Sequence, residues 1–242
     1  MENSMFNKIY SHWEEVMKEV NTSKGFSRIL NKEITSIHYA CILEQIFHHT
    51  RENPQIQTFA TAFFRGHQRT QIKPFYRHAI SEIGHDQLAL NDMKALGFET
   101  EHIPSSRPSN STTALLSYAF YQIQFRNPVG YLGYLFHLEY MPTHFGKDYM
   151  EALEKVGVSK EAMSFIFDHH TIDQGHIKMM QGYIRELVQT TDDLEEVKYA
   201  IEVTAKLYSD MVSDAIAKGD VLFEQAMNQK KESFAMERGS LQ

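Results

Sequence analysis

The chain has 242 residues, with 31 acidic and 24 basic side chains, and its formal net charge is −7 when histidine is neutral. A hydrophobic content of 42% and a charged content of 23% are typical of a globular protein, and the length suits one large domain rather than two. The acidic balance and the absence of a basic run argue against nucleic acid as the main partner.

The sequence also indicates where the protein works. Cys41 is the single cysteine, which precludes an internal disulfide and suits a reducing cytoplasm. Residues 1–8 lack the cationic start and apolar stretch of a signal peptide. The most apolar run, residues 114–125, is too short to span a membrane and contains glutamines. We therefore expect a cytoplasmic protein without a membrane partner.

Hydrophobic periodicity predicts helix through nearly the whole first half of the chain. The Asn53-Pro54 pair is expected to end the second helix, and Gly97 is expected to cap the fourth. Four helices are predicted there, over residues 3–21, 26–51, 56–66 and 71–96.

The second half begins with the clearest predicted loop, residues 98–112, which are rich in Pro, Ser and Asn. Asn127-Pro128 predicts a helix start, and Pro142 predicts a kink. Helices are predicted over residues 113–125, 128–155, 159–189 and from 191 or 192 to about 228. With residues 229–242 as a polar tail and no convincing strand, the prediction is a single all-α domain over 1–242.

The first candidate site is a polar triplet on the predicted helix 159–189. His169, Asp173 and His176 fall at i, i+4 and i+7, so they project from one face, which is otherwise apolar. An ionised aspartate is costly in such a stripe unless something pairs with it, and a metal ion is a natural partner. A histidine–aspartate hydrogen-bond network in a helical core is the alternative, and this helix alone does not separate the two.

Two further fragments carry ligand chemistry. Glu82-x2-His85 on the predicted helix 71–96 is the i, i+3 pair used in dinuclear carboxylate sites of helical bundles, although glutamate and histidine are common enough to make it weak alone. Glu139 lies in an apolar stripe with Leu132 and Leu135, where an unpaired glutamate is unfavourable.

Together these fragments supply three carboxylates and three imidazoles, which suit two metal ions better than one. Mixed imidazole and carboxylate ligands favour iron or manganese, with zinc possible. Thiolate zinc sites and iron–sulfur clusters are excluded because Cys41 is alone.

The order Glu-x2-His, isolated Glu and His-x3-Asp-x2-His on successive long helices resembles the heme-oxygenase-like di-iron oxidases, also called iron-containing redox enzymes, with their UndA- and CADD-like members. The resemblance spans about residues 30–190 and is strongest over 76–97. It implies a compact helical bundle of about seven helices and a homodimer. The metal ligands that it implies are Glu82, His85, Glu139, His169, Asp173 and His176.

The function that this resemblance implies is O2-activating oxidation or oxygenation of a small organic substrate that stays unidentified. The expected cofactors are two Fe(II) ions, with manganese possible, and O2 is the expected co-substrate. The family spans decarboxylation, desaturation, carbon–carbon cleavage and N-oxygenation, so the reaction type stays open. Candidate substrate-pocket residues, each of which could equally be an ordinary packing residue, are Tyr39, Phe47, His78, Gly133 and Tyr134.

Two alternatives remain. The protein could keep this fold and bind metal without oxidative turnover. It could also be a metal-free relative, similar to the thiaminase-like TenA group or the quinone-forming oxidase PqqC. TenA-type chemistry needs a nucleophilic cysteine, and Cys41, with Ile37 and Ile42 nearby, has the surroundings of a buried, inert thiol.

Overall fold

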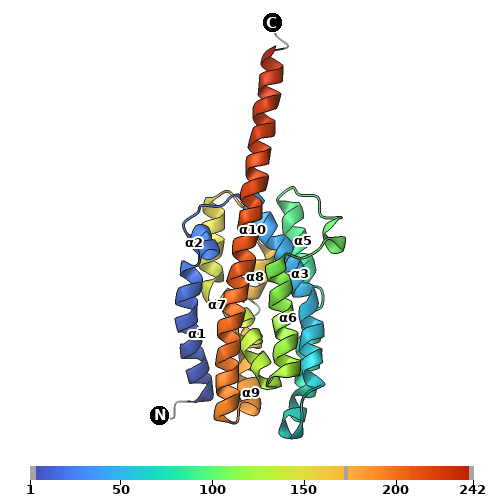
Figure 1. The fold of residues 1–242 in the computed structure, drawn as a ribbon, viewed down its shortest axis with the longest axis vertical. Helices are drawn as coiled ribbons and strands as arrows, with labels where there is room; N and C mark the ends of the chain where they lie inside the picture. Colours follow the sequence, from blue (N-terminus) through green and yellow to red (C-terminus); the bar gives the residue numbers. More distant parts are fainter. Residues whose placement is uncertain (1–3, 172–173, 240–242) are drawn as a thin grey trace.

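The structure is a computed structural model that describes residues 4–171 and 174–239, without the side chains of residues 174, 176 and 234–239. Within that part of the chain the regular structure is helical and no strand occurs, which confirms the all-α prediction. Figure 1 shows the long helices side by side along one axis, with α10 (Thr191–Gly239) extending beyond one end of the bundle.

The remaining helices follow in chain order. The first half contains α1 (Met5–Thr22), α2 (Lys24–Leu30), α3 (Ser36–Thr61), α4 (Ile72–Glu82) and α5 (His85–Ala95). The second half contains α6 (Asn110–Phe125), α7 (Tyr131–Lys155), α8 (Ser164–Thr171) and α9 (Gln174–Leu187). Short 3-10 turns lie at Gly66–Gln71, Ile103–Ser105, Pro128–Gly130 and Lys160–Ala162.

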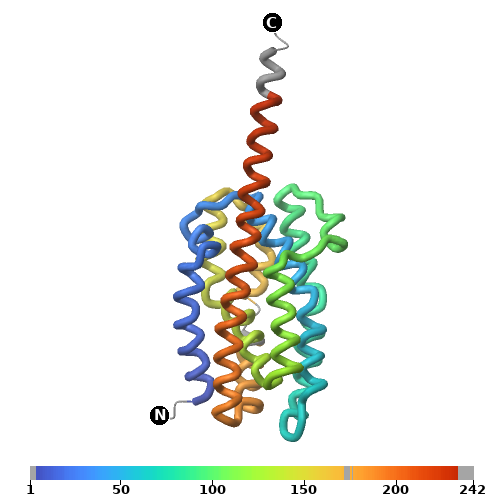
Figure 2. Tube along the Cα trace, in the orientation of Figure 1, coloured from blue at the N-terminus to red at the C-terminus, as the bar shows by residue number. Residues whose placement is uncertain are grey.

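Helix α3 forms the centre of the fold. Every residue from His38 to Thr50 is buried, so this helix is surrounded on all sides rather than exposing one polar face. Helices α4, α5, α6 and α10 pack against it. The chain trace also brings α1 against α10, although they lie at opposite ends of the sequence (Figure 2). The polar side chains on α3 therefore face the interior.

The predicted end of a helix at Asn53-Pro54 is wrong, because α3 continues to Thr61 with Pro54 inside it. Proline removes one backbone donor and disfavours a helix interior. Here Ile56 and Gln57, one turn further on, are 0% and 1% exposed. Burial of the turns on both sides of Pro54 outweighs the local cost, as tertiary context commonly overrides propensity.

Two predicted long helices are divided, which gives more helical segments than the expected seven or so. The predicted helix 71–96 breaks at Gly84, whose φ of +98° lies in the left-handed region. The predicted helix 159–189 is divided into a 3-10 turn, α8 and α9. In the last predicted helix, the end at about 228 is too early, because α10 runs to Gly239. Within the described residues, none of these helices has the combination of length and apolarity that a membrane span requires.

Candidate metal centre

The turn between α4 and α5 brings the first two candidate ligands together. Glu82 is the last residue of α4 and His85 is the first residue of α5. Their expected place on one continuous helix is wrong, because Ile83 is extended and Gly84 is left-handed. The reversal nevertheless leaves His85 Nδ1 3.2 Å from Glu82 Oε2. The turn thus supplies the proximity that the i, i+3 spacing was expected to supply.

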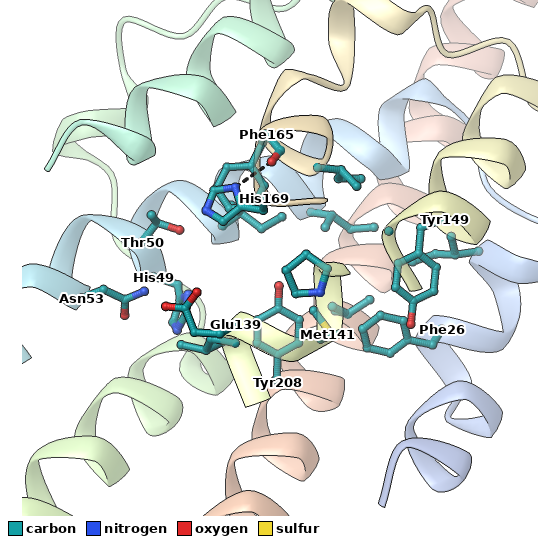
Figure 3. A pocket seen from close by; sticks show the side chains of 18 of the residues that line it. Phe26, His49, Thr50, Asn53, Glu139, Met141, Tyr149, Phe165, His169 and Tyr208 are labelled. Carbon is teal, nitrogen blue, oxygen red and sulfur yellow. Dashed lines mark hydrogen bonds between the residues drawn. The ribbon is translucent and has the colours of Figure 1, made fainter. Parts of the chain in front are cut away.

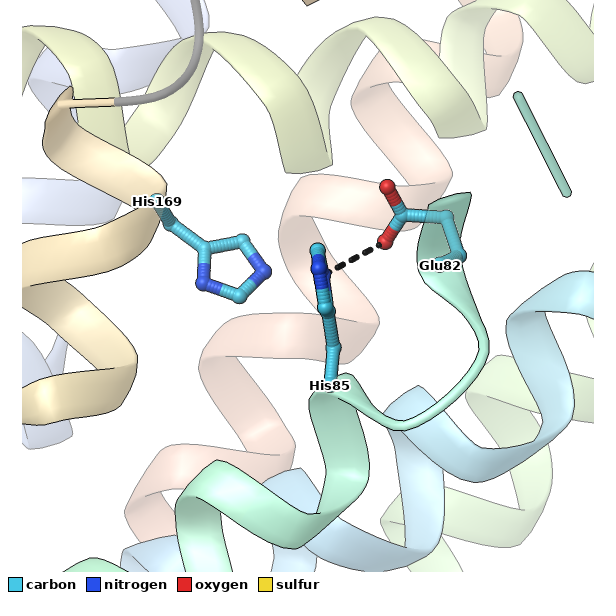
Figure 4. A group of neighbouring side chains, drawn as sticks. All are labelled: Glu82, His85 and His169. Atoms are coloured by element: carbon cyan, nitrogen blue, oxygen red, sulfur yellow. Dashed lines mark ion pairs between the residues drawn. The ribbon is translucent and has the colours of Figure 1, made fainter. Parts of the chain in front are cut away.

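His169, on α8, joins this pair from another part of the chain. Its ring centroid lies 5.0 Å from that of His85, with the two rings nearly perpendicular. One potential ligand atom each from Glu82, His85 and His169 lies within 4.8 Å of the others. Figure 4 shows the imidazole of His169 directed toward His85, which in turn faces Glu82. Three side chains from α4, α5 and α8 therefore converge.

The tautomer of His169 suits metal binding. Its Nδ1 lies 2.7 Å from the carbonyl oxygen of Phe165. Because a carbonyl only accepts, Nδ1 carries the proton and donates, and Nε2 keeps its lone pair. An imidazole held in this way, with one nitrogen bonded to a backbone carbonyl, is the common arrangement of a metal-ligating histidine.

A second group of potential ligands lies next to the first. His78 Nε2 is 3.0 Å from Glu139 Oε1 and 3.6 Å from Glu82 Oε1. Ligand atoms of His78, Glu82 and Glu139 again lie within 4.8 Å of one another. Glu82 belongs to both groups, and a carboxylate with two oxygens is the residue type that can serve two ions at once.

Burial and nearby charge have opposite effects on the pKa of Glu82. Glu82 and Glu139 are only 8% and 6% exposed. Burial of Glu82 by itself raises its carboxyl pKa, but hydrogen bonds and charge from His78 and His85 outweigh it, and the pKa lies below its ordinary value. The carboxyl group is therefore ionised at neutral pH, which is the form that binds a metal ion.

The start of α8 is fixed to α5 by a buried aspartate. Asp92, on α5, is 0% exposed and accepts hydrogen bonds from the backbone N–H groups of Ser164 and Phe165, both at 2.9 Å, and from the Ser164 hydroxyl. A carboxylate that caps the first turn of a helix also interacts favourably with the helix dipole. Because α5 begins at His85 and α8 carries His169, this contact fixes two candidate ligands relative to each other.

Of the six sequence-predicted ligands, Asp173 and the side chain of His176 lie outside the described residues. The other four, Glu82, His85, Glu139 and His169, lie in the two groups above, and His78 lies between the two glutamates.

A cavity of about 110 Å³ adjoins the two groups and is partly lined by Glu82, Glu139 and His169. In Figure 3, His49, Thr50 and Asn53 lie at one end, and Phe26 and Tyr149 lie at the other. Glu139 and His169 lie nearer the polar end. The candidate ligands therefore border a space in which a small molecule could bind.

The five predicted substrate-pocket residues have different places. Tyr39 lines the cavity, whereas His78, Phe47, Gly133 and Tyr134 are absent from its described lining. Tyr134 contacts two residues of the lining, because its hydroxyl forms hydrogen bonds with His49 and Asn53. At Gly133 an added Cβ would lie 2.2 Å from the Val197 carbonyl oxygen, so this glycine permits close packing of α7 on α10.

The polar side chains of α3 that line the cavity were not among the site residues predicted from the sequence. His49, Asn53 and Gln57 recur at i, i+4 and i+8, so they share one helix face. The spacing is visible in the sequence, but the helix predicted over residues 26–51 ended before Asn53 and Gln57 and so separated both from His49.

The donor set fits iron or manganese. It consists of imidazole nitrogens and carboxylate oxygens without a thiolate, which suits iron and manganese. His169 is held in the ligating tautomer, and Glu82 is ionised. The residues therefore match the chemistry of a non-heme iron site with nitrogen and oxygen ligands.

Comparison with known proteins agrees with this chemistry. A sequence model of a family described as iron-containing redox enzymes matches residues 42–209, about two thirds of the chain. The matched region contains all six sequence-predicted ligands. Among curated proteins, none matches the chain.

Solved structures show the same fold. A domain of unknown function with a heme oxygenase-like fold from Shewanella denitrificans OS217 is 24% identical, with a TM-score of 0.77 over 90% of this chain and 92% of its own. A TenA homolog from Pseudomonas syringae pv. tomato DC3000 is 11% identical, with a TM-score of 0.69 over 88% of this chain and 93% of its own. A TenA homologue from P. horikoshii OT3 is 9% identical, with a TM-score of 0.71 over 89% of this chain and 99% of its own. At these identities the matches establish a heme-oxygenase-like fold and nothing finer.

Proposed function

Because the chain belongs to the family of iron-containing redox enzymes, we propose that it is a non-heme di-iron oxidase or oxygenase that uses O2 to oxidise a small organic substrate. The observation that carries the proposal is the pair of ligand groups that share Glu82 and border the cavity. A site of this kind needs both a set of metal ligands and a neighbouring space for the substrate, and the two occur together here.

The proposed roles follow from the contacts. Glu82, His85 and His169 would hold one ion, and Glu82 with Glu139 would contribute to the second. Asp173 and His176 remain sequence-predicted ligands that complete the set. When bound, ferrous iron supplies electrons for the reduction of O2.

Several residues act by orientation rather than by ligation. His78 Nε2 lies 3.0 Å from Glu139 Oε1, and this contact restricts the direction of that carboxyl group. The Phe165 carbonyl holds His169 in the tautomer that exposes Nε2. The apolar side chains along the rest of the cavity exclude water and keep its dielectric constant low.

The test is O2 uptake by the full chain. Protein loaded with Fe(II) under anaerobic conditions is mixed with oxygenated buffer in an oxygen electrode, alone and with candidate substrates. The proposal predicts uptake that a substrate accelerates and that the Glu82→Gln variant loses. Iron binding without substrate-dependent uptake would instead identify a metal-binding protein of the same fold. Loading with Mn(II) in parallel determines which metal supports turnover.

We further propose that the chain forms a homodimer, as the resemblance to this family implies. Sedimentation velocity of the full chain should then give the mass of two chains. The mass of one chain, at all accessible concentrations, would contradict this.

A further inference from the structure

One face of α3 forms a polar stripe inside an otherwise apolar cavity. His49, Asn53 and Gln57 lie at successive turns of the helix, and all three line the cavity. The remaining lining is mostly aliphatic and aromatic. Small-molecule sites typically have this composition, with a few placed polar groups that fix the orientation of a largely apolar ligand.

A chain of hydrogen bonds determines which groups on this stripe donate and which accept. The Tyr134 hydroxyl donates to Asn53 Oδ1 at 2.9 Å. Since its one hydrogen is used there, the same hydroxyl accepts from His49 Nε2, which lies 2.8 Å away. With Oδ1 of Asn53 engaged, the free side of that amide is its NH2 group, which is a donor.

Gln57 adds a second amide donor. Its side chain is 1% exposed, and its Nε2 has no hydrogen-bond partner among the described residues. A buried amide donor without an acceptor is unfavourable, so each such group calls for an explanation. Because Gln57 lines the cavity, a ligand oxygen there would supply the missing acceptor.

The charges around the cavity select against an anionic ligand. No lysine or arginine occurs among the described lining residues, while Glu82 and Glu139 do. Burial lowers the pKa of His49 to about 4, so this imidazole is neutral at physiological pH. An ammonium ligand is also disfavoured at the polar stripe, because it can only donate and the groups left open on Asn53 and Gln57 are donors as well.

The opposite end of the cavity is apolar. Phe26 and Tyr149 lie there in Figure 3, with ring centroids 5.4 Å apart, and Leu153 and Val212 also line the space. The volume of about 110 Å³ is somewhat smaller than an engineered apolar cavity of roughly 150 Å³ that admits benzene. A short hydrocarbon chain or a single small ring is therefore the appropriate size.

We propose that this cavity binds an uncharged amphipathic molecule with a short hydrocarbon part. Its carbonyl or hydroxyl oxygen accepts hydrogen bonds from the Asn53 and Gln57 amides, and its hydrocarbon part extends toward Phe26 and Tyr149. The identification of this ligand as the substrate rests on the proposed oxidase function. Its binding in the cavity does not depend on that function.

The test compares three probes of equal chain length that differ in charge: hexanamide, hexanoate and hexylammonium at pH 7.5. Isothermal titration calorimetry of the full chain, before and after Fe(II) loading, measures each affinity. Hexanamide should bind at least about tenfold more tightly than either ion to the chain without iron. Equal or tighter binding of hexanoate or hexylammonium, or no binding of any probe, would overturn the proposal.

Variants locate the binding site. Gln57→Leu should weaken the binding of hexanamide about tenfold, because it replaces one amide donor with an apolar side chain of similar size. Asn53→Leu should have a comparable effect. Gln55→Leu, an exposed position on the same helix outside this cavity, should leave the affinity within about twofold. Unchanged affinity in both Gln57→Leu and Asn53→Leu would overturn the assignment.

The two proposals fail separately. A chain that binds hexanamide but no iron would retain the ligand site and refute the oxidase. A chain that binds iron and consumes O2 but does not discriminate among the three probes would refute the ligand site and retain the oxidase.

Discussion

His78 Nε2 lies 3.0 Å from Glu139 Oε1, so a single imidazole connects α4 to α7 beside the candidate metal centre. Both side chains are almost completely buried. Burial removes water from both groups, and their mutual contact partly offsets that loss of hydration.

Replacing His78 with leucine should lower the free energy of unfolding by about 1–3 kcal/mol, because the buried Glu139 loses its polar contact with the imidazole. His78→Gln should lower the free energy of unfolding by less, since the glutamine amide keeps a donor at this position. Urea denaturation of the two variants and the parent measures the difference. A leucine variant as stable as the parent would mean that this contact contributes little to stability.

The Gly84 turn should be sensitive to a single methyl group. An added Cβ meets nothing within 4 Å, so the cost of Gly84→Ala comes from the left-handed φ alone, about 1–2 kcal/mol. Because the turn sets His85 beside Glu82, the iron content should fall as well. Denaturation and metal analysis of the variant check both effects.

Gly182→Ala is the matched control. Gly182 lies within α9, and an added Cβ there also meets nothing within 4 Å. In a helix interior alanine is favoured by up to about 1 kcal/mol, so this variant should be as stable as the parent or more so. If both alanine variants gain stability, the left-handed turn is not required.

Two buried histidines should make the protein sensitive to mild acid. Burial lowers the pKa of His49 to about 4, and burial together with the charge of His49 lowers that of His137 to about 3. In the unfolded chain both titrate near 6.5. As pH falls below that value, protons bind the unfolded state first, so each histidine removes about 1.4 kcal/mol of stability per pH unit. The loss should continue until the folded-state pKa is reached.

His137→Leu isolates one of these contributions. Neither ring nitrogen of His137 has a hydrogen-bond partner in the described part of the chain, so the variant should not lose stability at pH 7. Between pH 6 and 5 its free energy of unfolding should fall less steeply, by about 1.4 kcal/mol per unit. The exposed His67→Leu should keep the parent's slope. A parental slope in His137→Leu would refute the assignment.

Cys41 distinguishes the proposed oxidase from a thiol-dependent relative of the same fold. Burial raises the pKa of its thiol to about 11, with a smaller opposing effect from Lys218. The side chain is 4% exposed and is not among the described residues that line the cavity. Cys41→Ala should therefore leave iron-dependent O2 uptake within about twofold of the parent. Loss of uptake in a correctly folded variant would favour the thiol-dependent alternative.

The helical class and the proximity of Glu82 to His85 were predictable from the sequence because both depend on short-range spacing. Glu82 and His85 remain neighbours whether one helix or a tight turn joins them. The turn itself was missed, because a glycine within an apolar-periodic segment is ambiguous between a helix interior and a left-handed break.

The cavity was harder to predict. Its lining comes from α2, α3, α7, α8 and α10 together with Glu82 at the end of α4, and no single-segment pattern specifies which faces meet. Gly133 illustrates this, since space for substrate and close helix packing are equally compatible with a glycine, and only the position of α10 decides. Gln57 was overlooked because Pro54 suggested a helix end that burial overrides.

The most direct test of the account is the iron content of the full chain. Protein loaded with excess Fe(II) without oxygen, passed through a desalting column and analysed by mass spectrometry should retain close to two irons per chain. Glu82→Gln should retain close to none, because Glu82 is shared by both ligand groups, whereas Glu224→Gln, on the exposed end of α10, should retain the parental amount. Parent protein without bound iron, or Glu82→Gln with as much iron as the parent, would contradict the di-iron account.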